Sequence, residues 1–205
     1  MGVAERKERE RLQRQNDIID AAEKVFMTKG FENATMEDVA EEAEFSKGTL
    51  YTYFQSKNEL CLSIVLRGIN VLMIRFDIVA SLDSPGLTKL RLLAEACRKF
   101  YVDFPNYAFA FSNYKQHRAG CHLVSSILDT IDEKNSVIRQ LFSSVIESGK
   151  IDHSIKTDTE SEKLSWILWG DISGLIPSSH FNSANANSAE YYNYTITLIC
   201  DAIKQ

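Results

Sequence analysis

The 205-residue sequence predicts an all-α protein. Apolar residues recur at helical spacing through most of the chain, and no segment alternates apolar and polar residues over the length of a strand. Three prolines and nine glycines leave room for long, uninterrupted helices. The composition, with 44% hydrophobic and 25% charged residues, is that of an ordinary globular protein and excludes a disordered chain.

The first predicted helix follows a charged N-terminal arm. Residues 5–16 are rich in charge and helix-prone, and from Ile18 to Phe26 apolar residues repeat at helical spacing. Lys29-Gly30 predicts the end of this helix, because glycine adopts the left-handed terminating conformation at little cost.

Two short helices joined by a tight turn are predicted next. Thr35 and Asp38 fit a capping box that opens the first of them. The turn falls at residues 44–45, and Ser46 is the expected N-cap of the second helix, which extends to Phe54. This arrangement is that of a helix-turn-helix.

The rest of the chain reads as a series of longer helices. Ser56 and Glu59 form a second capping box for a long helix that ends at Ser84-Pro85, where serine is the expected cap and proline the first helical residue of the next helix. Gly149 is expected to end another helix. The further helical patterns cover about 87–104, 106–118, 122–148, from Thr159 to about 176, and 189–204.

The net charge of −5 argues at first against a nucleic-acid partner, but local charge governs contact with phosphates. Residues 45–58 contain Lys47 and Lys57 and no acid, whereas the acids concentrate on the helix before the turn. Lysine can donate to guanine O6 or N7, threonine can contact a base, and Gly48 permits close approach. The bases of the arm fit a solvated helix end and a DNA contact equally well.

A set of motifs runs through residues 15–62: Ile19 and Ala22, Phe26, Lys29-Gly30-Phe31, Thr35, Val39-Ala40, Ala43, Ser46 to Tyr51 (SKGTLY), Tyr53-Phe54, Lys57 and Leu60. This set resembles the DNA-binding domain of the tetracycline-repressor (TetR) family, and beyond Leu60 only the count and order of helices match. The resemblance implies a DNA-binding domain at 1–56 and a helical effector-binding and dimerisation domain at 57–205. It also implies a homodimer that represses transcription and leaves its operator when a small molecule binds.

By the family pattern, eight residues would contact DNA. Thr35 would meet a phosphate, and Tyr51, Tyr53 and Lys57 would hold the backbone on either side of the reading helix. Lys47, Gly48 and Thr49 would face base edges at the start of the recognition helix, and Ser46, its N-cap, completes the set.

Two acids depart from the family pattern. Glu44 stands in the turn where glycine is usual, so a non-glycine residue is expected in the left-handed conformation. Glu37 stands where some relatives place a basic or polar DNA contact. It is either a cytosine contact or simply an acid at a helix N-terminus, and the second reading is favoured.

Aromatic residues between positions 100 and 114 are denser than a helical core needs, and two tryptophans follow on a later helix. Core packing accounts for any one of them. Together they predict an apolar or aromatic effector pocket with a few polar groups. The candidate effector-binding residues are Phe100, Phe104, Tyr107, Phe111, Tyr114, His117, Trp166 and Trp169.

The last two helices carry apolar stripes, which form either internal core or half of an intermolecular four-helix bundle. The resemblance favours the bundle, and the two-fold symmetry of a dimer predicts a near-palindromic operator. An activator, or a constitutive DNA binder without small-molecule input, is the alternative with the same fold.

Other classes of protein receive little support. The sequence lacks a phosphate loop, a nucleophile elbow and an HExxH motif, so an enzyme is not predicted. His117, Cys121 and His122 match no common zinc spacing, and neither a metal nor a cofactor is expected. Scattered cysteines without an export signal, and no apolar run of roughly 18 residues, predict a cytoplasmic protein with no membrane partner.

Overall fold

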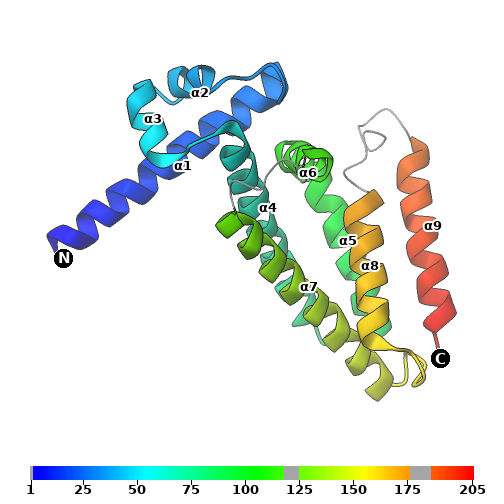
Figure 1. Cartoon of the computed structure of the whole chain (residues 1–205). Helices are drawn as coiled ribbons and strands as arrows, with labels where there is room; N and C mark the ends of the chain where they lie inside the picture. Colours follow the sequence, from blue (N-terminus) through cyan, green and yellow to red (C-terminus); the bar gives the residue numbers. More distant parts are fainter. Residues whose placement is uncertain (1, 118–124, 176–185) are drawn as a thin grey trace. The chain divides into compact units, whose positions relative to one another are not determined.

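The computed structural model describes residues 2–117, 125–175 and 186–205, and within these ranges the chain forms nine helices (Figure 1). The helices are α1 (Val3–Lys29), α2 (Met36–Glu42), α3 (Lys47–Tyr53), α4 (Lys57–Ala80), α5 (Gly86–Asp103), α6 (Pro105–His117), α7 (Ser125–Ile151), α8 (Ser161–Leu175) and α9 (Ala186–Ile203). Extended pairing in the described ranges is limited to one isolated bridge between Ile155 and Lys204. The predicted all-α class is therefore confirmed.

The helices form two compact units. The first contains Met1–Arg67 and Phe109–Leu128, and the second contains Gly68–Ala108 and Asp129–Gln205. Three helices, α4, α6 and α7, begin in one unit and continue into the other.

The core of the first unit forms where α1 and α2 pack together, with α3 against α2. The apolar residues that repeat at helical spacing on α1 are buried, and the ring of Phe26 meets that of Phe31 edge-on, with centroids 5.4 Å apart. Val39 and Leu50 are completely buried and anchor the two short helices. The charged arm is not a separate element, because α1 is one continuous helix whose first turns are exposed.

Three predicted helix boundaries of this unit are confirmed. Gly30 ends α1 at a φ of 78°. The Thr35 hydroxyl accepts from the amide of Asp38 at 3.1 Å, and the Asp38 carboxylate accepts from the amide of Thr35 at 2.9 Å. The hydroxyl of Ser46 accepts from the amide of Thr49 at 3.1 Å at the start of α3. These contacts join residues three apart, so local sequence is enough to specify them.

The core of the second unit is built by α5 with α8 and α9 and by aromatic packing between α4, α7 and α8. The rings of Phe76 and Phe142 meet edge-on with centroids 5.6 Å apart, and Trp169 meets Phe76 at 6.2 Å. Tyr192 of α9 is 1% exposed and donates from its hydroxyl to the carbonyl of Ala94 on α5 at 2.7 Å.

Two predicted helix ends of this unit are wrong. Serine does not cap α5: the helix begins at Gly86, after Pro85, and its first amides donate instead to the Asp152 carboxylate at 2.7 Å and the Ser154 hydroxyl at 3.1 Å. Gly149 does not end α7, which continues to Ile151. A Cβ on Gly86 would lie 2.4 Å from the backbone of Gly149, so the two glycines let α5 and α7 approach closely.

Candidate nucleic-acid interface

A tight turn sets the angle between α2 and α3. The amide of Phe45 donates to the carbonyl of Ala40 at 2.9 Å, and the amide of Glu44 donates to that of Glu41 at 3.1 Å. Glu44 has a φ of 57°, as the sequence predicts for a non-glycine residue at this position. The turn thus holds Glu44 in a left-handed conformation, which glycine would adopt without strain.

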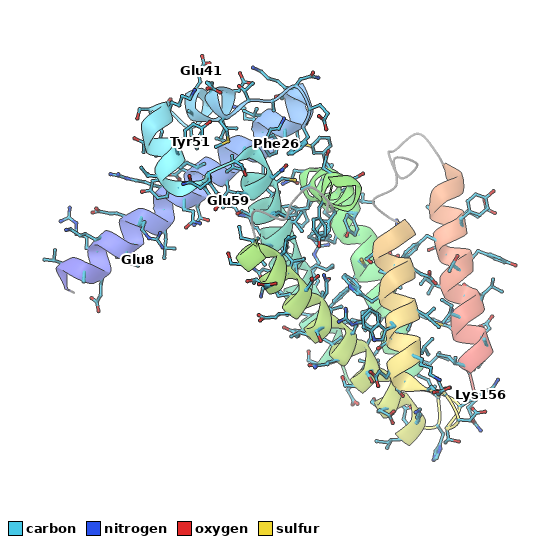
Figure 2. The ribbon with its side chains drawn as sticks, in the orientation of Figure 1. Glu8, Phe26, Glu41, Tyr51, Glu59 and Lys156 are labelled. Carbon is cyan, nitrogen blue, oxygen red and sulfur yellow. The ribbon has the colours of Figure 1, made fainter. Side chains whose placement is uncertain are left out.

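One face of α3 is free of core contacts. Leu50 is fully buried and anchors the helix, while Lys47 and Gly48 at its first two positions are exposed. The hydroxyls of Ser46 and Thr49 lie 2.8 Å apart at the same end. Tyr51, labelled in Figure 2, keeps 37% of its surface exposed. A lysine, hydroxyls and phenols on an exposed helix are groups that can meet base edges and phosphates.

An ion pair crosses the turn. The ammonium of Lys47, the first residue of α3, contacts the carboxylate of Glu37, the second residue of α2. The two side chains remain 59% and 55% exposed. The hydrogen bond between them lowers the pKa of Glu37 and raises that of Lys47. The sequence does not reveal this pair, because the two residues are brought together only by the folded turn.

Lys57 has a structural role that sequence analysis also missed. Its ammonium donates to the carbonyls of Phe31, Glu32 and Ala34, the last two at 3.1 and 3.0 Å. It also lies 4.6 Å from the centroid of the Phe31 ring. An ammonium has three N–H groups, so these three bonds use its whole donor capacity. Contact of Lys57 with a DNA phosphate stays a prediction, and it would require some of these bonds to break.

Three of the aromatic candidates for effector binding gather in the second unit. Phe100 stacks on Tyr107 with centroids 5.6 Å apart, and Phe104 lies 5.5 Å from each of them. Phe100 is fully buried, as in ordinary core packing, so effector contact here stays a prediction. The guanidinium of Arg75 lies over this cluster, 5.1 Å from the Phe104 ring.

The other aromatic candidates lie apart from that cluster. Phe111 and Tyr114 are buried in the first unit, and the side chain of His117 lies outside the described residues, as do Cys121 and His122. In the second unit Trp169 is buried and donates to Asn135 at 3.1 Å. Trp166 is 57% exposed, with Arg139 3.9 Å above its ring.

The described parts of the chain contain neither a cluster of metal-ligating side chains nor a membrane-spanning helix. No three His, Cys, Asp or Glu side chains in residues 2–117, 125–175 and 186–205 are grouped as metal ligands would be. None of the helices in these ranges combines the length and the hydropathy that a membrane span needs.

The two short helices, their turn and the exposed face of α3 form a helix-turn-helix, the motif that places its second helix in the major groove of DNA in other proteins. Residues 18–64 match the family of bacterial regulatory proteins described as the tetR family. This match to the family's N-terminal domain confirms the resemblance seen in the sequence.

Individual relatives extend the match along the chain. An uncharacterized HTH-type transcriptional regulator of Bacillus subtilis, YfiR, is 47% identical over 57 residues, which span only 28% of either protein. The HTH-type transcriptional repressor KstR2 of Rhodococcus jostii is 28% identical over 73% of this chain and 71% of its own. The structure of the regulator FadR from Bacillus subtilis in complex with stearoyl-CoA superposes with a TM-score of 0.71. At 18% identity, over 91% of this chain and 98% of that one, it shows a common fold.

Proposed function

We propose that this chain is a dimeric, cytoplasmic transcriptional regulator, and specifically a repressor that a small, largely apolar molecule releases from DNA. The observation that carries the proposal is the exposed face of α3, presented by a turn of helix-turn-helix geometry within the family-matched segment. The DNA-contacting residues are the eight named from the sequence, and the domains divide at residues 56 and 57. The nature of KstR2 as a repressor supports the direction of control.

Dimerisation is proposed through α8 and α9. Both helices bury one side in the second unit and leave large apolar side chains on the other. The exposed fractions of these side chains exceed one half: Trp166 57%, Ile167 53%, Tyr191 66%, Tyr194 62% and Leu198 52%. Nothing lies within 4 Å of a Cβ placed on Gly170, so a partner helix has room to approach there. A second copy would cover this apolar surface and space two reading helices for a near-palindromic operator.

Control by an effector is proposed to act through α4. This helix begins in the first unit and ends in the second, so a change in the packing of one unit reaches the other along one continuous element. An effector that binds one conformation of the body better shifts the population toward it. The cluster of Phe100, Phe104 and Tyr107, with the other candidates named from the sequence, is the proposed contact region. The FadR structure with stearoyl-CoA makes a long-chain acyl-CoA the first compound to test.

The test is selection of duplexes from a randomised library by the full-length protein, followed by titration of the selected duplex. The Lys47→Ala/Tyr53→Ala variant should lose at least about 10-fold in affinity, because a base contact and a backbone contact are removed. Lys99→Ala on α5, where the lysine is 62% exposed, is the control and should bind as the parent does. Undiminished binding by the double variant would refute the proposed interface. Stearoyl-CoA should release the DNA, whereas binding unchanged by any acyl-CoA would favour the alternative without small-molecule input.

A further inference from the structure

We propose that Glu37 and Lys47 act together as one composite reader of a C·G base pair in each half-site. The inference rests on the proposed function and assigns Glu37 a role in specificity. Its starting point is the ion pair across the turn, in which both side chains stay more than half exposed at the end of the reading helix.

Glu37 is not needed to cap α2. The adjacent acid, Asp38, supplies the carboxylate of the capping box to the amide of Thr35. Asp38 also forms an ion pair at 2.7 Å with Lys29, the last residue of α1. The carboxylate of Glu37 contacts the ammonium of Lys47 on α3 and also accepts from its own backbone amide. Its position in the first turn of α2 accounts for the bond from its own amide but not for the contact with Lys47.

The pair offers complementary hydrogen-bonding groups. A carboxylate has about four acceptor positions and an ammonium has three N–H groups, so both side chains, each more than half exposed, keep hydrogen-bonding capacity for a ligand beside their mutual contact. In the major groove cytosine presents its N4 amino group as a donor beside the O6 and N7 acceptors of guanine. Glu37 would accept from cytosine N4 while Lys47 donates to guanine.

The pairing also changes how Lys47 treats the rest of the DNA. A lysine alone is attracted to any phosphate, whatever the sequence. Beside Glu37 its charge is compensated, and the carboxylate repels phosphates. Glu37 therefore exchanges non-specific attraction for selectivity at one base pair.

These two effects predict opposite changes in one variant, Glu37→Gln, which keeps the shape of the side chain and removes its charge. On a scrambled duplex its affinity should rise at low salt, and log K against log salt should steepen by about 0.9 per protomer, since one phosphate contact is gained. In selection from a randomised duplex library, the preference for C·G at one position of each half-site should fall by on the order of 10- to 100-fold.

Glu41→Gln is the matched control, because it removes the same charge from the exposed side of the same helix (Figure 2). It should select the same site as the parent, with the same salt slope. Lys47→Gln should lose the preference at the same base pair as Glu37→Gln, and the double variant should lose little more than either single one.

Glu37→Gln selecting the parental site with the parental salt slope would overturn the composite reader while leaving the proposed function intact. A fall in affinity on selected and scrambled duplexes alike would also overturn it, because that is the mark of a purely structural residue. If the unchanged protein selects no sequence at all, the proposed function fails, and the composite reader fails with it.

Discussion

Replacement of Lys57 by methionine tests the structural role of its ammonium. Methionine keeps most of the length of the side chain but removes the donor that joins the carbonyls of Phe31, Glu32 and Ala34. A hydrogen bond from a charged group contributes about 1.5–3 kcal/mol, and bonds that share one donor are not additive. Two of the three bonds are partly buried, so we expect the first unit to lose about 2–3 kcal/mol on this substitution.

Amide hydrogen exchange of peptides from residues 18–40 is the suitable assay, because both tryptophans lie in the second unit and report on it instead. A loss of about 2–3 kcal/mol lowers protection by about 30- to 150-fold. Lys24→Met is the control: its ion pair with Glu42 is at the surface, where such pairs contribute about 0–1 kcal/mol. Equal protection in the two variants would refute the reasoning about Lys57.

Two further predictions concern glycines and pH. Gly86→Ala should destabilise the second unit by about 1–3 kcal/mol or more, because its Cβ would meet the backbone of Gly149, whereas Gly170→Ala, where a Cβ meets open space, should not. Thermal unfolding followed by tryptophan fluorescence would measure both, and an unchanged midpoint in Gly86→Ala would contradict the close approach. The pKa of Asp38 is lowered to about 2, first by its hydrogen bond from Lys29. Its contribution to the stability of the first unit is therefore complete above the pKa of Asp38 in the unfolded chain, and is lost as the pH falls through about 2. Between pH 5 and pH 2 the melting temperature of the parent protein should therefore fall more steeply than that of Asp38→Asn. Parallel curves of melting temperature against pH would count against this role.

Sequence alone predicts the helix-turn-helix segment well because its defining contacts are local. The Thr35–Asp38 capping box, the Ser46 cap and the left-handed Glu44 all involve residues a few positions apart. Helix periodicity and cap chemistry act over that range, so they can be read directly from the residues.

Contacts between distant segments set the features that sequence analysis missed. Gly149 looked like a helix terminator, but it is a site of close approach to Gly86, and only the packed structure reveals that. The amide of Gly86 is capped by Asp152, which lies 66 positions away. Lys57 is a lysine in a family motif, yet its donors are directed into its own unit. Periodicity and propensity carry no information about such pairs.

The proposed function requires two copies of this chain to read DNA through α3 on one face of the duplex. A hydroxyl-radical footprint of the full-length protein on its selected duplex tests it most directly. We expect two protected tracts related by two-fold symmetry, with centres about 10 base pairs or a multiple of that apart. Protection that is uniform along the duplex, or a single tract without a symmetric partner, would contradict the account.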